Sequence, residues 1–244
     1  MEKRLRTVVL FLFFSIILFP LFPFGSGVSQ ENLVRFSLWA QTEVYPGFFK
    51  SDVSEKEKSL NIVREEDEWY SVPVRKIREI APFLVEGMVY GWRFSYTPYD
   101  RARGVEEFFE FEPVNRLSEE ELSRIHYKKP WAEGDRLSAW IEFQRTAFQS
   151  HRFRAWESVL HPRIKGVGFA HLSKGFDGIR EASEEALKNA VREYERTILK
   201  TKPKEVSGIV LIREPPLIGI DAGRYRITLD FFMETDRILE YRTF

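Results

Sequence analysis

The sequence predicts an α+β fold in which antiparallel, β-rich sheets carry amphipathic helices packed on one face. Two observations predict it. Apolar and polar residues alternate over several short stretches, as in strands that turn one face to a core. Other segments place apolar residues three and four positions apart, as in helices with one buried face. A chain with both patterns suits helices laid across a sheet.

The best-defined stretch is 183–233, which predicts a helix followed by two strands. Ser183 is placed to cap the helix, and Pro203 would end it. Residues 206–212 are mostly apolar and rich in β-branched side chains, as in a strand buried on both faces. Residues 225–231 alternate strictly and predict a second strand with one face on a core.

The remaining elements are shorter. Alternation is clearest over 88–97, and Ser118 with Glu121 forms a capping-box pattern that predicts a helix over 118–125. Other predicted strands are 33–40, 68–72, 105–113, 136–143 and 148–159, with 44–49 as a strand or turn and 237–244 as a strand or tail. The rest divides into a helix over 73–87, a charged loop over 51–68, a linker over 127–135 and an irregular segment over 161–178.

Short motifs in the two halves resemble one another. Residues 35–40 and 136–141 share the pattern Arg-x-Ser-x-Trp, which would fit two duplicated β-β-α-β-β units. Coincidence is the open alternative, because a similar run occurs at 152–156 inside the second half. The expected domain order is a signal peptide at 1–29, a first α+β unit at 30–115, a short helix and linker at 116–135, and a second α+β unit at 136–244.

The N-terminus has the layout of a secretory signal peptide. A basic start precedes the apolar run 8–19, and small residues then allow cleavage after Gly27 or Ser29. An uncleaved membrane anchor is the alternative, but the run is short beside the roughly 20 residues of a spanning helix. We therefore expect an exported protein, periplasmic or extracellular, with membrane contact only through the N-terminal segment if it is uncleaved.

Composition excludes several function classes. Lys plus Arg and Asp plus Glu both number 37, so the whole-chain charge gives no reason to expect nucleic acid as a partner. The chain has no cysteine, which excludes disulfides, Cys–zinc sites and a thiol nucleophile. No cofactor is predicted, and the expected partner is an unknown protein or glycan of the cell envelope.

A small set of residues at a predicted hairpin tip forms the candidate binding site. Aromatic and guanidinium groups together can stack on sugars or hold anionic groups, and loop tips often carry function. An ordinary charged turn is the simpler interpretation. The candidate binding residues are Tyr96, Tyr99, Asp100, Arg101 and Arg103.

Catalytic and metal-binding patterns are weak. Three histidines recur every ten residues, which is not the local spacing of metal ligands, so no metal site is predicted. They are His151, His161 and His171. Four glutamates near 106–112 could supply the carboxyl pair of a glycosidase, but their alternation with Phe fits a half-buried strand.

These observations favour a soluble, non-catalytic binding or interaction protein of the cell envelope. A glycan-acting envelope hydrolase is the alternative, and catalytic residues remain unassigned. An outer-membrane β-barrel is less favoured, because counting back in twos from Phe244 gives Arg242 and Glu240, not an apolar row.

Overall fold

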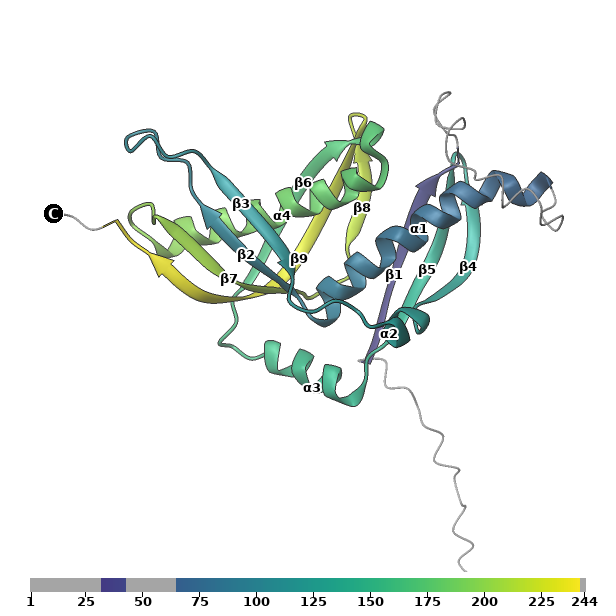
Figure 1. Cartoon of the computed structure of the whole chain (residues 1–244), viewed down its shortest axis with the longest axis horizontal. Helices are drawn as coiled ribbons and strands as arrows, with labels where there is room; N and C mark the ends of the chain where they lie inside the picture. Colours follow the sequence, from purple (N-terminus) through teal and green to yellow (C-terminus); the bar gives the residue numbers. More distant parts are fainter. Residues whose placement is uncertain (1–31, 43–64, 242–244) are drawn as a thin grey trace, which may run out of the picture.

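The computed structural model describes residues 32–42 and 65–241, of which residues 65–70 are described by their backbone alone (Figure 1). The predicted signal peptide, the predicted strand or turn at 44–49 and most of the predicted charged loop at 51–68 lie outside these residues. No helix in the described ranges is long and apolar enough to cross a membrane.

The protein has the predicted α+β architecture, with two antiparallel sheets. The smaller sheet has the order β1 (Leu33–Gln41), β5 (Arg136–Gln144), β4 (His126–Glu133). The larger, curled sheet has the order β3 (Phe108–Pro113), β2 (Trp92–Thr97), β7 (Glu205–Ile212), β9 (Arg224–Leu239), β6 (Arg163–His171), and β8 (Leu217–Asp221) also pairs with β9 (Figure 1). The helices are α1 (Glu65–Val89), α2 (Glu119–Ser123), α3 (Ala147–Trp156) and α4 (Gly175–Ile198), with a 3-10 turn at Leu172–Lys174.

The two faces of the larger sheet bury different helices. Phe231 of β9 belongs to the main core, which α1 and α4 share with residues of both sheets. The next residue, Phe232, points the other way and packs with Trp156 of α3 and Leu211 of β7. The amphipathic helices α1 and α4 therefore cover one face, and α3 covers part of the other.

Two glycines bring α4 unusually close to the sheet. A Cβ atom at Gly166 would lie 1.8 Å from the carbonyl oxygen of Ala186, and one at Gly168 would lie 2.0 Å from that of Ala182. Only glycine permits this approach, because any side chain would collide with the helix backbone. The contact fixes the position of α4, whose last turns form the wall of the pocket described below.

Several predictions are confirmed. The predicted strands 33–40, 136–143, 206–212 and 225–231 correspond to β1, β5, β7 and β9. The capping box of α2 is present, since the Ser118 side chain accepts from the backbone N–H of Glu121 and the Glu121 side chain accepts from that of Ser118. The predicted strand 105–113 is shorter, because β3 begins at Phe108.

The strand predicted at 148–159 is wrong, because 147–156 forms α3. Thr146 and Gln149 make a reciprocal capping box: the Gln149 N–H donates to Thr146 Oγ1 (3.2 Å) and the Thr146 N–H donates to Gln149 Oε1 (2.9 Å). This pattern is readable in the sequence, but the alternation of Arg with Phe and Ala at 152–155 imitates a strand.

The irregular segment predicted at 161–178 is also wrong. Its first part is β6, and its end already belongs to α4, which begins at Gly175. Ser183 does not cap the helix but lies buried inside it, with its hydroxyl donating to the Ile179 carbonyl (2.8 Å). The glycines of β6 interrupt the apolar alternation that would have predicted a strand. Their reason is the close approach of α4, a contact with a distant segment that the local sequence does not reveal.

Helix α1 is longer than the helix predicted at 73–87, because its burial in the core stabilises additional turns. The strand predicted at 68–72 is wrong, since those residues belong to α1. The helix contains both Pro73 and Pro82, each of which costs about 3 kcal/mol in an isolated helix interior. Burial of Ile77, Ile80 and Leu84 in the core offsets that cost. The strand predicted from residue 88 accordingly begins only at Trp92.

The linker predicted at 127–135 is in fact mostly β4, at the edge of the smaller sheet. Pro130 lies where the pairing register shifts between Lys128 and Trp131, and an edge strand tolerates a residue without an N–H at such a bulge. Each sheet combines strands from both predicted units, since β1 pairs with β5 and β2 pairs with β7. Duplication of the units stays a prediction.

Candidate ligand pocket

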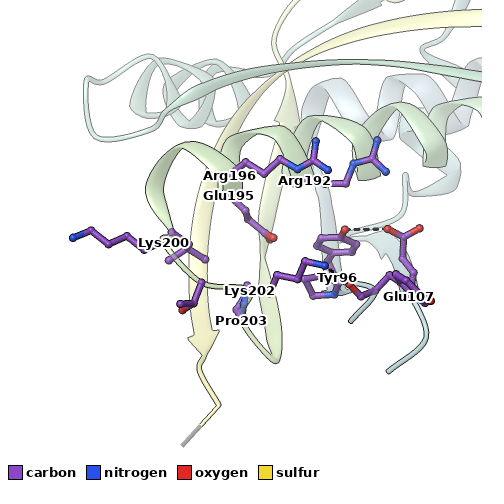
Figure 2. A pocket seen from close by; sticks show the side chains of 12 residues that line it. Tyr96, Glu107, Arg192, Glu195, Arg196, Lys200, Lys202 and Pro203 are labelled. Atoms are coloured by element: carbon purple, nitrogen blue, oxygen red, sulfur yellow. Dashed lines mark hydrogen bonds between the residues drawn. The ribbon is translucent and has the colours of Figure 1, made fainter. Parts of the chain in front are cut away.

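A pocket of about 580 Å³ opens between the end of α4 and the β2–β3 hairpin. Its walls come from three places: the last turns of α4, the 199–203 connection to β7, and the residues that flank the hairpin turn. Figure 2 shows side chains from all three lying around one space. These segments are far apart in the sequence, and the pairing of β2 with β7 brings them together.

Tyr96 and Glu107 form one side of the pocket. Tyr96 is 1% exposed, and its hydroxyl donates to Glu107 Oε1 (3.0 Å). Burial, followed by the hydrogen bond to Glu107, raises the pKa of Tyr96 above its ordinary value. Glu107 is also 3.3 Å from Lys188 Nζ on α4. The hydrogen bond from Tyr96 to Glu107 and the ion pair of Glu107 with Lys188 thus connect the β2–β3 hairpin to α4.

Glu195 is the most unusual residue in the pocket wall. It lies in the last turn of α4, is only 5% exposed, and its Oε1 has no hydrogen-bond partner within the described structure. Burial raises the pKa of its carboxyl to about 8, so the group is mainly protonated at neutral pH. Figure 2 shows this side chain pointing from α4 toward the space above the 199–203 connection.

Four cationic side chains also line the pocket. Arg192 Nη2 donates to Asn189 Oδ1 (2.9 Å), while its buried Nε has no hydrogen-bond partner in the described part of the chain. Arg196 pairs with Glu193 (2.7 Å), and Lys202 Nζ donates to the Tyr99 carbonyl oxygen (2.8 Å). The fourth is Lys200, which extends away from the centre of the space in Figure 2. Cations near a helix carboxyl end also complement its dipole, so they have a structural role as well.

The structure separates the predicted binding residues into two groups. Tyr96 and Tyr99 line the pocket, and Tyr99 is 47% exposed. The other three lie in the turn beyond it. Asp100 accepts from the backbone N–H of Ala102 (3.0 Å) and pairs with Arg103 (2.5 Å), and this bond lowers the pKa of the Asp100 carboxyl.

Asp100 therefore shapes the turn, while Arg103 also lies 4.2 Å from the centre of the Tyr241 ring. Arg101 is exposed at the tip. Binding of a ligand by any of the five residues stays a prediction.

Most of the aromatic side chains that the sequence placed in strands build the core. Trp92 and Tyr96 of β2, and Trp156 at the end of α3, are at most 8% exposed. Trp140 is half-buried on the smaller sheet, where it packs against Trp131 and lies beneath the guanidinium of Arg35. High aromatic content by itself thus gives little support to ligand binding.

A second hollow of about 540 Å³ lies between α1, β3 and α4. Glu86 in its wall accepts from the Leu117 N–H (3.0 Å), and burial raises the pKa of this carboxyl. Here the buried acid has a partner, so the group is explained by packing. Among residues 32–42 and 65–241, no group of three or more His, Asp or Glu could hold a metal ion.

Sequence reasoning missed the residues of α4 and of the 199–203 connection. Glu195 falls one turn after Val191 on the buried stripe of the predicted helix, and a carboxyl on an apolar stripe was the signal that could have marked it. The cations at 192, 196, 200 and 202 recur at spacings that follow one side of the helix and its exit. Nothing local relates them to Tyr96 and Glu107, which lie about 90 residues earlier.

Fold and site together define an α+β protein with a polar pocket between α4 and the β2–β3 hairpin of its larger sheet. A protein-family model matches residues 23–241, so the chain belongs to that family, whose description names no activity. An "Uncharacterized protein" of Treponema pallidum (strain Nichols) is 25% identical over 218 residues, which are 88% of this chain and 85% of the relative. No solved structure matches the chain.

Proposed function

We propose that this chain is an exported binding protein of the cell envelope, and that it holds a ligand or a partner's side chain in the pocket beside α4 without catalysing a reaction. The signal-peptide layout supports export. The observation that carries the binding proposal is the buried carboxyl of Glu195, which has an unpartnered oxygen in the wall of an open pocket.

The cost of that arrangement is the reason to assign it a role. Leaving a buried polar group without a partner costs about 1–3 kcal/mol, and such groups are uncommon in folded proteins. The position would be occupied more stably by Leu, which fits the apolar neighbours on the same face of α4. A ligand that supplies the missing hydrogen bond would explain why position 195 carries a carboxyl group and not an apolar side chain.

Binding can be tested by amide NMR on the protein that lacks residues 1–29. A small-molecule extract of the cell envelope is expected to shift the amides of 96–99 and 199–203, and Glu195→Leu, which removes the hydrogen-bonding group, should weaken that response. Glu181→Leu is the matched control, because Glu181 lies on the same helix but pairs with Lys174 outside the pocket. Shifts that avoid both segments would contradict the proposal.

Export is tested separately by the mass of the mature protein. Cleavage after Gly27 or Ser29 and recovery from a periplasmic or extracellular fraction are expected. Recovery of the intact chain from the cytoplasm would contradict export, while an intact chain in the membrane fraction would indicate the uncleaved anchor.

A glycan-acting hydrolase is the second candidate, and one observation favours it. The pocket contains a buried, protonated acid, Glu195, together with Glu107, a carboxylate that is ion-paired with Lys188. Glycosidases use a pair of carboxyl groups whose different environments let one act as an acid and the other as a base or nucleophile. If the protein is a hydrolase, purified envelope glycan should release reducing ends with the natural chain and not with Glu195→Gln or Glu107→Gln. The binding proposal expects no release with any of the three.

A further inference from the structure

The pocket lining is strongly cationic. Arg192, Arg196 and Lys202 line the pocket together with two carboxyl groups, while Lys200 lies at its edge and extends away; one of the carboxyl groups, Glu195, is mainly protonated at neutral pH. The other, Glu107, already has Lys188 as a partner. A concave surface with this excess of positive charge raises the local concentration of anions.

Arg192 and Arg196 are spaced to act on one group. They are four residues apart on α4, which places them on the same face of the helix. Figure 2 shows their side chains running in the same direction along the helix. A guanidinium offers several N–H donors in a planar fork, and a phosphate or carboxylate accepts two of them at once. Glu193 lies beside both arginines, 2.7 Å from Arg196 Nη1 and 3.8 Å from Arg192 Nε. Its side chain is 60% exposed, and surface ion pairs of this kind contribute little, so an anion can compete with Glu193 for both guanidinium groups.

Glu195 adds the complementary feature. A protonated carboxyl can donate one hydrogen bond, and an anionic oxygen is a strong acceptor for it. An ionised Glu195 would instead repel the anion. Lys202 lines the same pocket from the 199–203 connection, where its ammonium group donates to the Tyr99 carbonyl oxygen (2.8 Å).

We propose that the pocket binds a small molecule through a phosphate or carboxylate group, which Arg192, Arg196 and Lys202 hold while Glu195 donates a hydrogen bond to it. This inference rests on the proposed binding function and specifies its ligand chemistry. The exposed ring of Tyr99 at the rim is available to stack on the organic part of the ligand, such as a sugar ring.

The probes are glucose 6-phosphate and glucuronate, with glucose as the neutral counterpart, titrated into the chain without residues 1–29 and followed by amide NMR. Both anions should shift 96–99 and 199–203, and glucose should bind at least 10-fold more weakly. Arg192→Gln combined with Arg196→Gln should weaken anion binding by about 10- to 100-fold. Arg226→Gln, an exposed arginine on β9 away from the pocket, should leave it unchanged.

The pH profile separates a binding role of Glu195 from a structural one. Several charged or titratable groups line the pocket with Glu195 or pair with its arginines. They are Arg192, Glu193 and Arg196 on α4, Lys200 and Lys202 on the connection, Tyr96 on β2, and Tyr99 and Glu107 on the hairpin. Anion affinity should fall as pH rises from 7 to 9, since ionisation of Glu195 removes the donor, whereas a phosphate ester is already fully ionised above its pKa of about 6. Glu195→Gln, which keeps a donor, should flatten the profile.

The outcomes distinguish the two proposals. If envelope extract shifts the pocket amides while glucose 6-phosphate and glucuronate do not, the anion inference is overturned and the binding function stands. If neither the extract nor any probe shifts them, both are overturned. A titration with phosphatidylglycerol vesicles tests whether the anionic group belongs to a lipid. Binding of the vesicles, without binding of the soluble anions, would assign the phosphate to a lipid headgroup. An affinity for glucose equal to that for the anions would also overturn the inference.

Discussion

The carboxyl group of Glu195 connects the stability of this protein to its proposed site. It is buried at the carboxyl end of α4, where both the loss of solvent and the negative end of the helix dipole disfavour its charged form. In the unfolded chain the same group ionises near its ordinary pKa of 4.5, whereas in the fold its pKa is about 8. Folding therefore binds a proton at neutral pH.

This difference predicts the pH dependence of stability. Because the pKa of Glu195 is higher in the folded protein, protonation of this group contributes to the free energy of unfolding. The contribution is fully present below pH 4.5 and is lost as the pH rises through about 8. Over that window the loss is on the order of 3–5 kcal/mol. Urea unfolding at pH 5 and pH 9 should show Glu195→Gln losing less stability than the natural chain. Equal losses in the two proteins would contradict the raised pKa.

Replacement by leucine gives the matching test of the pocket. Glu195→Leu removes the unpartnered oxygen and is expected to raise the free energy of unfolding at pH 8 by about 1–3 kcal/mol. If it instead destabilises the protein, the carboxyl has a structural partner, and the reason for assigning it a binding role is lost. Glu181→Leu at an exposed site of α4 controls for helix propensity.

At the scale of elements, the contact between α4 and β6 positions the pocket. The carbonyl oxygen of Ala182 would lie 2.0 Å from a Cβ atom at Gly168, far inside van der Waals contact. Gly168→Ala must therefore push α4 off the sheet or bend β6. We expect a loss of about 3 kcal/mol or more, measured by urea or thermal unfolding.

Gly219 provides the control for that substitution. It also lies in a strand, β8, but a Cβ atom there would have no neighbour within 4 Å. Gly219→Ala should be neutral or stabilising by about 0.5–1 kcal/mol, because alanine has less conformational freedom to lose on folding. A similar loss at both positions would mean that close packing of α4 on β6 does not explain the glycines.

At the scale of the whole molecule, the predicted units 30–115 and 136–244 share both sheets. β5 depends on β1 for one neighbour, and β7 depends on β2. In addition, α1 packs against strands of both sheets, so its absence would expose much of the main core. Either half alone would therefore expose to solvent part of the sheet surface that the other half covers.

We therefore expect residues 136–244 alone to show no cooperative unfolding transition, because the fragment exposes the edges and the core that the first half covers. Mixing it with residues 30–135 should restore the transition, followed by circular dichroism and amide dispersion. A sharp transition of the 136–244 fragment by itself would support an autonomous second unit and contradict this expectation.

How much the sequence predicts depends on the range of the interactions that decide each element. Strands with local alternation, such as 225–231, and the capping box at Ser118 could be predicted because their signals lie within a few residues. The same local reasoning failed at Ser183, where a good capping residue lies buried within a longer helix. Two of the five predicted binding residues, Tyr96 and Tyr99, line the pocket, and their binding role stays a prediction, while Glu195 was not among the candidates.

By itself the sequence determined the α+β class, most of the strands and the absence of cysteine chemistry, because periodicity and composition are properties of the local chain. Only the tertiary structure decided that glycines of β6 admit α4, that 147–156 is a helix, and that Glu195 shares a pocket with Tyr96 and Glu107. Those outcomes depend on contacts between segments far apart in the sequence, and burial in such contacts outweighs the tenths of a kcal/mol by which most local propensities differ.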